Sequence, residues 1–318
     1  MISRRLGVRL PAAALLLLAP LLLTAPSQAR GACQVEKLAQ VPVSNVLGFL
    51  VVPASIDGAR VSLLLDTGAA TGLITPEAAW QLRLPADPSH FSLLQGTGGD
   101  GGVSPHALVH RLEIGGLAVS GVTAPLGALP ALPRVVPPVA GLLGADLLSH
   151  FDLELDLRRQ LLALYQVSGE DESGSCESAV PPDWKTPFDA IPLRRSGDRL
   201  LAGVQVNGRG VTALIDTGAR SIVLSTASAE QLGVNAAALA RDSGGITGGV
   251  DMREVMFHWH RFASLRIGGE TIQNPELTVS PLDEEADLLL GSSYFATRRV
   301  WLSYATSRMF VQRSGRAP

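Results

Sequence analysis

The chain contains the same unit twice. Residues 51–68 (VVPASIDGARVSLLLDTG) align with residues 201–218 (LAGVQVNGRGVTALIDTG) at an offset of 150. Further blocks recur in the same order: TGG at 97–99 and 247–249, LEIGG at 112–116 and LRIGG at 265–269, and two segments that begin with LLG, at 142–165 and 289–312. Chance explains one such match but not a series in a fixed order. A duplicated chain is predicted to fold into two similar lobes.

Each copy is expected to begin with a β-hairpin. Alternating apolar residues lead into a two-residue turn, Asp57-Gly58 in the first copy and Asn207-Gly208 in the second, and out again. Asp-Gly and Asn-Gly favour the tight turns between antiparallel strands, because both turn positions need a positive φ. The second strand of each predicted hairpin ends at an Asp-Thr-Gly sequence.

Helix is scarce in this pattern. Residues 75–84, with Thr75 as the cap and Pro76 in the first turn, form the best helix candidate, and residues 225–234 occupy the matching place. The predicted fold class is therefore mainly β, with two homologous lobes related by a pseudo-twofold axis and few short helices. The acidic, Ser/Gly-rich and then Pro-rich stretch between the copies indicates an exposed linker. The expected domains are an N-terminal lobe at 30–167, a linker at 168–187 and a C-terminal lobe at 188–318.

The first 29 residues have the pattern of a secretory signal peptide. Three arginines precede an apolar run, and small residues before residue 30 offer a cleavage site after Ala29. The apolar run is too short to span a bilayer, and no later segment is long and apolar enough to do so. We therefore expect an exported protein without a membrane segment after cleavage, with the periplasm favoured over the external medium.

Composition narrows the classes of partner. Hydrophobic residues make up 46% of the 318 residues, enough for one or two substantial cores. Removing residues 1–29 takes away three arginines and no acid, so the formal net charge of −3 becomes −6. A mildly acidic chain with only two lysines has no basic stripe for phosphates, which argues against nucleic acid as a partner.

The two cysteines lie at the edges of the predicted first lobe. Cys33 precedes its first structured region, and Cys176 lies in the linker. In an oxidising compartment they either form one disulfide that ties the N-terminal arm to the linker or remain two free thiols, and their spacing does not decide between these.

The two aspartates of the repeated motif suggest acid–base chemistry. Asp66 and Asp216 are expected to emerge from equivalent strand ends and to approach each other across the pseudo-twofold axis. Two like charges a few ångströms apart do not both ionise cheaply, so such a pair shares one proton. It can take a proton from water with one carboxylate and give a proton to a substrate carbonyl with the other.

These motifs resemble the aspartic proteases. The pattern of two apolar residues followed by Asp-Thr-Gly-Ala, with Leu-Leu-Gly further on, occurs in both copies and is most similar to the retropepsin-like lobe, here duplicated in one chain. The resemblance covers nearly all of residues 45–313, and the paired motif is highly specific. It implies that Asp66 and Asp216 are catalytic and that the rest of each motif supports the active loops. These support residues are Thr67, Gly68, Ala69, Thr217, Gly218 and Ala219.

The resemblance also suggests individual roles and a pH range. Thr67 and Thr217 are expected to cross-brace the loops, and the glycines to allow close approach to the carboxylates. Pepsin-like enzymes usually have Ser or Thr where this chain has Ala69 and Ala219, and losing that hydroxyl raises the carboxyl pKa. We therefore expect activity at mildly acidic to near-neutral pH.

The glycine-rich blocks match the flaps that close over substrate in this family. The second block, GGITGGV at 244–250, is similar to a retropepsin flap tip with Ile246 as its apolar contact, whereas Gly96 stands at the matching place in the first block. The first flap is therefore expected to be shorter-reaching, disordered or differently used, or to be a plain flexible loop. The candidate flap and substrate-binding residues are Thr97, Gly98, Gly99, Ile246, Thr247, Gly248 and Gly249.

The predicted function is that of an aspartic endopeptidase, active as a monomer on a peptide or protein held between the lobes. No metal or organic cofactor is expected; His258 and His260 share one face of a strand, but no third ligand accompanies them. The alternative is a catalytically silent module of the same fold that binds peptides or proteins. The sequence leaves open the substrate, the cleavage specificity and any propeptide.

Overall fold

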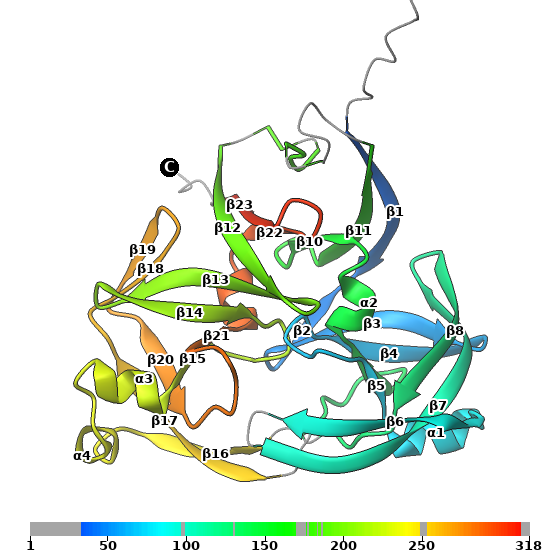
Figure 1. Cartoon of the computed structure of the whole chain (residues 1–318), viewed down its shortest axis with the longest axis horizontal. Coiled ribbons are helices and arrows are strands. Elements are labelled where there is room, and N and C mark those ends of the chain that lie inside the picture. Colours follow the sequence, from blue (N-terminus) through cyan, green and yellow to red (C-terminus); the bar gives the residue numbers. More distant parts are fainter. Residues whose placement is uncertain are drawn as a thin grey trace, which may run out of the picture.

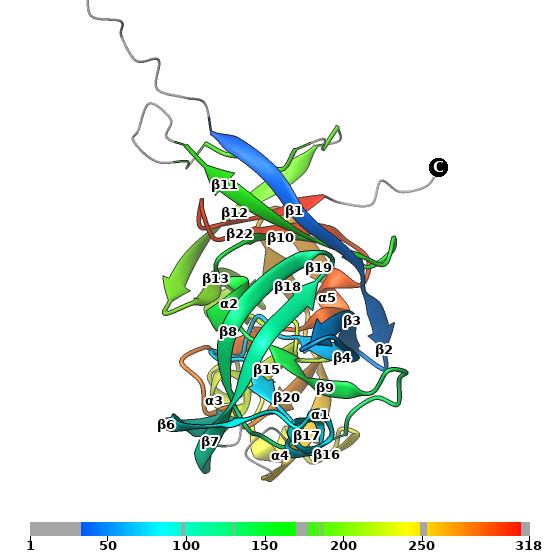
Figure 2. The same cartoon turned by 90° about the vertical axis from the view of Figure 1, so that its right-hand side faces the viewer.

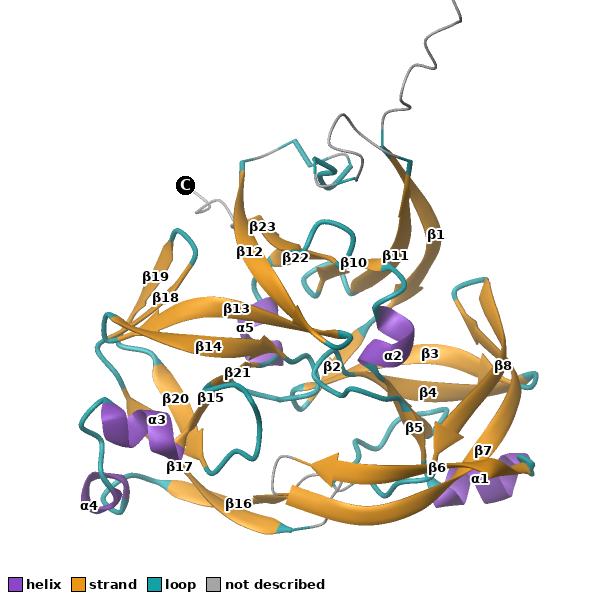
Figure 3. Ribbon diagram, in the orientation of Figure 1, coloured by secondary structure: helices purple, strands orange, loops and turns teal. Residues whose placement is uncertain are grey.

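The computed structural model is built mainly from β-strands, with a few short helices between and beside them (Figure 3). The structure describes residues 33–96, 99–129, 131–169, 176, 178–182, 184–185, 187–248 and 253–312. The predicted signal peptide, residues 1–29, lies outside the described residues. The mainly β fold class predicted from the duplicated sequence is confirmed.

The described part of the first copy contains eleven strands and two helices. In chain order these are β1 (Gln34–Pro42), β2 (Ser44–Val46), β3 (Phe49–Ile56), β4 (Ala59–Leu65), β5 (Leu73–Ile74), α1 (Pro76–Leu82), β6 (Ala86–Gly96), β7 (Gly99–Ile114), β8 (Leu117–Pro125), β9 (Val139–Leu143), α2 (Ala145–Leu148), β10 (Asp152–Asp156) and β11 (Leu161–Ser168).

The second copy follows the same plan. In chain order its elements are β12 (Phe188–Ser196), β13 (Arg199–Val206), β14 (Arg209–Ile215), β15 (Val223–Ser225), α3 (Thr226–Gln231), α4 (Ala236–Leu239), β16 (Gly244–Gly248), β17 (Glu254–Arg261), β18 (Ser264–Ile267), β19 (Glu270–Gln273), β20 (Glu276–Ser280), β21 (Leu288–Leu290), α5 (Ser292–Phe295), β22 (Arg299–Ser303) and β23 (Arg308–Gln312).

Each copy forms a lobe, the first around a separate sheet and the second around strands that continue through β12 into a further layer. The first lobe has the strand order β5-β9-β4-β3-β7-β6, with β2 on β3 and β8 on β7. In the second lobe β12, β13, β14, β21, β15, β20, β17 and β16 follow one another. The strand before each Asp-Thr-Gly lies parallel to the Leu-Leu strand of its lobe, β4 to β9 and β14 to β21. Figure 1 shows the two lobes side by side, with β6 and β7 facing β16 below them.

A third layer joins the lobes and was not predicted from the sequence. The strands β1, β11, β10, β22, β23 and β12 pair in that order, so three come from each copy. The copies meet where β10 pairs antiparallel with β22, with Leu155 opposite Val300. Figures 1 and 2 show this layer above both lobes. One hydrophobic core runs through both lobes and includes Leu50, Leu63 and Leu155 from the first copy with Leu200, Leu288 and Val300 from the second.

The two predicted hairpin turns are confirmed. Asp57 and Gly58 connect β3 to β4 with φ values of 50° and 85°, and Asn207 and Gly208 connect β13 to β14 with φ values of 50° and 78°. Positive φ at both positions matches the right-handed twist of the flanking strands. These turns set the register that brings each second strand to its aspartate.

The two predicted helix starts are confirmed as well. The hydroxyl of Thr75 accepts a hydrogen bond from the amide of Ala78 at the start of α1, and Pro76 occupies its first position. At the start of α3, the hydroxyl of Ser225 accepts in the same way from the amide of Ser228. Each cap satisfies an amide that the first turn leaves without an intrahelical partner.

Replacing Thr75 by alanine is expected to lower the free energy of unfolding by about 1 kcal/mol, because the amide of Ala78 loses its buried partner. Chemical denaturation followed by circular dichroism measures the change. Thr75→Ser, which keeps the hydroxyl, is expected to retain most of the stability. Equal losses in both variants would contradict the capping role.

The segment between the copies is only partly as predicted. A disulfide bond joins Cys33 to Cys176 and so links the start of β1 to this segment. The interpretation of residues 168–187 as exposed is wrong at Trp184, which is 9% exposed and packs in a cluster with Tyr165, Trp301 and Phe310. The guanidinium of Arg299 lies 4.8 Å from the centre of a Trp184 ring. Trp184 thus covers one face of the layer that joins the lobes.

In the part of the chain that the structure describes, none of the helices has both the length and the apolar character needed to cross a bilayer.

Candidate active site

Parallel strand pairs position the two aspartates. The amide of Asp66, directly after β4, donates to the carbonyl of Leu143 at the end of β9 at 3.0 Å. The amide of Asp216, directly after β14, donates to the carbonyl of Leu290 at 3.2 Å. The Leu-Leu segments therefore hold the loops from the side.

The two glycines after these leucines have a role that sequence reasoning missed. A Cβ atom at Gly144 would lie 2.3 Å from the backbone nitrogen of Gly72, and one at Gly291 would lie 2.0 Å from the carbonyl oxygen of Ser221. The backbone of each active loop thus passes directly over a glycine. The repeated Leu-Leu-Gly was visible in the sequence, but its contact with the loop needed the structure.

Thr67 and Thr217 join the two loops through four hydrogen bonds. The Thr67 hydroxyl donates to the carbonyl of Ile215 at 2.7 Å and accepts from the amide of Thr217 at 3.1 Å. The Thr217 hydroxyl donates to the carbonyl of Leu65 at 2.8 Å and accepts from the amide of Thr67 at 3.0 Å. Both side chains are at most 1% exposed. The bonds cross between the lobes and fix the separation of the two loops.

The backbone of each loop orients its own carboxyl group. One oxygen of Asp66 accepts from the amides of Gly68 and Ala69 at 3.0 and 2.9 Å. One oxygen of Asp216 accepts from the amides of Gly218 and Ala219, both at 3.0 Å. The second oxygen of each carboxyl group takes part in neither of these hydrogen bonds.

Gly68 and Gly218 let each loop approach the opposite carboxyl group. A Cβ atom at Gly68 would lie 2.4 Å from Cγ of Asp216, and one at Gly218 would lie 2.3 Å from Cγ of Asp66. No side-chain carbon fits at such distances. The two carboxyl groups are therefore brought together across the pseudo-twofold axis.

The surroundings favour the protonated form of this pair. Burial raises the pKa of Asp66, although the amides of Ala69 and Gly68 oppose the shift. Burial, followed by the nearby charge of Asp66, raises the pKa of Asp216 well above its usual range. Such a pair can hold one proton between two oxygens and supply one acid and one base.

Gly218→Ala is expected to lower the free energy of unfolding by about 1–3 kcal/mol, because its Cβ atom collides with the carboxyl group of Asp66. Denaturant unfolding measures the change. Gly210→Ala is the matched control, since a Cβ atom there meets nothing within 4 Å. If both substitutions leave stability unchanged, the close approach at Gly218 is contradicted.

Ala69 and Ala219 anchor the loops to the helices that follow. The carbonyl of Ala69 accepts from the amide of Ala145 at 2.8 Å, and that of Ala219 accepts from the amide of Ser292 at 2.7 Å. Neither alanine offers a hydroxyl group to the carboxyl pair, which the sequence already indicated.

The second predicted flap is a hairpin of β16 and β17. Ile246 pairs with Met256, and these side chains are 63% and 60% exposed. Thr247 and Gly248 follow Ile246 on the same strand, and Gly249 lies outside the described residues. An exposed apolar pair near the end of a hairpin offers contact area for an extended peptide.

The first predicted flap is a hairpin of β6 and β7, and of the alternatives given for it only the shorter-reaching one is at odds with the length of its strands. Its strands have 11 and 16 residues, against 5 and 8 for β16 and β17. A Cβ atom at Gly99 would lie 2.5 Å from Nη1 of Arg253, just before β17, so the hairpins meet (Figure 1). Thr97 and Gly98 lie outside the described residues.

The histidines of the HWH segment lie on β17. Nδ1 of His260 lies 2.6 Å from a carboxylate oxygen of Asp242. Among the described residues, His, Cys, Asp and Glu form no group of three or more that could hold a metal ion.

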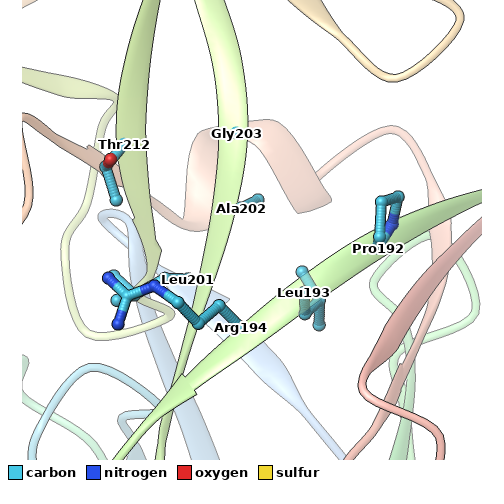
Figure 4. Close-up of a pocket in the computed structure, with 7 residues that line it drawn as sticks. All are labelled: Pro192, Leu193, Arg194, Leu201, Ala202, Gly203 and Thr212. Atoms are coloured by element: carbon cyan, nitrogen blue, oxygen red, sulfur yellow. The ribbon is translucent and has the colours of Figure 1, made fainter.

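A hollow on the second lobe lies away from these residues. A hollow of about 270 Å³ lies over β12, β13 and β14, and Figure 4 shows the residues that line it. Its lining residues are Pro192, Leu193, Arg194, Leu201, Ala202, Gly203 and Thr212. It contains neither a candidate catalytic residue nor a flap residue, so we place the candidate site at the paired loops.

Two β lobes that each present an Asp-Thr-Gly loop, joined by reciprocal threonine hydrogen bonds, define a duplicated protein of the retropepsin-like class. A family model described as "Aspartyl protease" matches residues 52–147 and 202–294, one match in each copy. The chain belongs to the aspartyl protease family.

Two other comparisons complete this description. The crystal structure of basic 7S globulin from soybean is similar at 12% sequence identity with a TM-score of 0.48, over 89% of this chain and 96% of that chain. No curated protein sequence matches the chain.

Proposed function

We propose that the protein is an active aspartic endopeptidase that cleaves peptide bonds with Asp66 and Asp216. The observation that supports this most directly is the approach of two carboxyl groups with raised pKa values across the pseudo-twofold axis, each oriented by two backbone amides. A pair that repels itself costs folding free energy, and a module that only binds peptides has no need of it.

The mechanism is general acid–base hydrolysis. The ionised carboxylate takes a proton from water, whose oxygen attacks the scissile carbonyl carbon, while the protonated partner gives its proton to the carbonyl oxygen. The tetrahedral adduct then collapses: the leaving nitrogen takes a proton from the pair, one hydroxyl of the adduct returns a proton to the pair as the new carboxyl group forms, and the C–N bond breaks. The pair ends with the single proton with which it began. No covalent intermediate, metal or organic cofactor is required.

The pH range follows from the same groups. Burial raises the pKa of both carboxyls, and neither Ala69 nor Ala219 supplies a hydroxyl to offset it. We therefore propose activity at mildly acidic to near-neutral pH, where the pair holds one proton. A profile that peaks only near pH 2–3 would contradict this assignment.

The substrate is a peptide or protein that lies extended under the two hairpins. Ile246 of the second hairpin supplies an apolar contact for this substrate. The strands of the first hairpin around Gly99 cover the substrate as well. Because one chain contains both aspartates, we propose a monomer as the active form. We also propose export after removal of residues 1–29, to the periplasm rather than the medium.

A mixed peptide library tests the proposal. The chain lacking residues 1–29 is incubated with the library from about pH 3 to about pH 8, and new termini are identified by mass spectrometry. Cleavage that disappears in both Asp66→Asn and Asp216→Asn is the expected result. Peptide binding without cleavage by a folded protein would replace the proposal with the silent binding module.

A further inference from the structure

A charged pair lies beside the active loops, and no motif in the sequence pointed to it. Glu284 lies between β20 and β21, and Arg199 opens β13. Their side chains are 17% and 18% exposed, and Nη1 of Arg199 lies 2.8 Å from a carboxylate oxygen of Glu284. The pair is largely enclosed, so its charges are screened less than those of an ion pair on the open surface.

Arg199 also reaches the loop of the other lobe. The same nitrogen, Nη1, donates to the carbonyl oxygen of Gly68 at 3.4 Å, next to Asp66 in the first Asp-Thr-Gly. Nη2 contacts Glu285 at 3.4 Å. One guanidinium therefore connects the acidic segment of the second lobe to the active loop of the first.

We propose that Arg199 and Glu284 are positioning residues of the candidate active site: Arg199 holds Glu284 at a fixed place beside the two aspartates, and Glu284 sets the pH range in which they share one proton. This inference rests on the proposed function, because it concerns the chemistry of that same pair. Neither residue is assigned a contact with substrate.

The effect of Glu284 on the pKa values of the two aspartates agrees with this geometry. The negative charge of Glu284 raises the pKa of Asp66 and of Asp216, in addition to the larger effect of burial. A fixed anion disfavours further negative charge on the pair, so its shared proton is retained to higher pH.

Among the residues of the first lobe that the structure describes, no ion pair corresponds to that of Arg199 and Glu284. The position of Arg199 is taken by Phe49 in the first copy, at the repeat offset of 150. The guanidinium of Arg220 lies 5.3 Å from the centre of the Phe49 ring. The loop that precedes β9, residues 126–138, contains no acidic residue. Glu284 therefore makes the distribution of charge around the two similar active loops unequal.

Other charged groups of the described residues lie around the loops, and each has a place or partner different from that of Glu284. Asp146, at the start of α2, accepts from the amides of Gly72 and Leu147, and burial raises its pKa. Arg220 follows the second active loop and is held at Phe49, and Asp198 adjoins Arg199. Arg253 and Asp283 lie at the tip of the first hairpin, next to Gly99.

The test is the titration of the two aspartates in Glu284→Gln. Carbon-13 NMR of the side-chain carboxyl groups, assigned with Asp66→Asn and Asp216→Asn, follows the pair without any need for cleavage. Removing the anion lowers the pKa of the pair, so its titration is expected to move to lower pH. On the alkaline side of the cleavage profile, kcat/KM is expected to fall about threefold, and on the acid side to rise by a similar factor.

Three further variants test whether the shift in titration depends on a negative charge at residue 284 and on Arg199. Glu285→Gln removes the same charge one residue further along and is expected to leave the titration unchanged. Glu284→Asp keeps the charge and is expected to restore most of the wild-type profile. In an Arg199→Met background, Glu284→Gln is expected to shift the titration less, because Glu284 is no longer held.

The outcomes distinguish this inference from the proposed function. An unchanged titration in Glu284→Gln, or an equal shift in Glu285→Gln, would overturn the role of Glu284. An undiminished shift in the Arg199→Met background would overturn the role of Arg199. A protein that shows the expected titration but cleaves nothing would support the charged pair and contradict the endopeptidase.

Discussion

Asp216→Asn is expected to reduce peptide cleavage by about 10³-fold or more, because an amide neither takes a proton from water nor gives one to a carbonyl oxygen. Asparagine has the size of aspartate, and its carbonyl oxygen can accept from the amides of Gly218 and Ala219 as the carboxylate does. The loss is therefore expected in kcat, with the fold retained. Single-turnover cleavage of a peptide found in the library measures it.

The same substitution is expected to stabilise the folded protein at neutral pH. The pKa of Asp216 is raised above the ordinary value of 3.8, so the folded state binds its proton more tightly than the unfolded state. Stability therefore falls as the pH rises from about that value through the raised pKa, and the loss is complete above it. Asp216→Asn removes this pH-dependent loss of stability. Its Tm at neutral pH is therefore expected to be about 2 °C or more above that of the wild type.

Two measurements serve as controls for these expectations. Asp66→Asn is expected to lose cleavage to a similar extent, since the proton transfers need both groups. At a pH well below 3.8 the Tm values of the wild type and Asp216→Asn are expected to converge, because the carboxyl group is then protonated in both states. Cleavage that survives either substitution would refute the proposed mechanism.

Thr67→Val is expected to lower the free energy of unfolding by about 3 kcal/mol or more. Valine has the shape of threonine without the hydroxyl group, so the carbonyl of Ile215 and the amide of Thr217 are left buried without these partners. Each such loss costs about 1–3 kcal/mol. Denaturant unfolding measures the change, and cleavage is expected to fall as well because the loop separation is no longer fixed.

Thr67→Ser is the matched variant, because it keeps the hydroxyl and removes only a methyl group. We expect it to retain most of the stability and activity. Thr217→Val is expected to resemble Thr67→Val, since its hydrogen bonds mirror those of Thr67. A double variant that costs much less than the two single changes combined would show that the four bonds act as one unit. Stability unaffected by Thr67→Val would contradict the cross-brace.

The parts of the fold that depend on local sequence were predictable. The Asp-Gly and Asn-Gly turns need positive φ, and the caps at Thr75 and Ser225 need a hydroxyl, so each is visible in a few neighbouring residues. The duplication added what a single motif lacks, because two equal loops imply a pair of aspartates that face each other. The candidate catalytic residues thus followed from repetition rather than from any one pattern.

The parts that depend on distant contacts were not predictable. The pairing of β10 with β22 joins residues about 150 positions apart, and nothing in either strand specifies its partner. Trp184 was assigned to an exposed linker because its neighbours are polar or proline, yet it packs against Tyr165 and Trp301. Arg199 belongs to no motif, and its contacts with Gly68 and Glu284 arise only when the lobes meet.

The layer that joins the lobes also determines how the protein can be tethered. Its strands include β1 and β23, the first and last strands of the described chain, while β6, β7 and β16 lie on the opposite side of the molecule in Figures 1 and 2. A linker attached ahead of β1 or after β23 would therefore anchor the protein to a bead or sensor surface with both hairpins turned towards solution. Immobilised protein in that orientation offers peptides free access to the paired loops.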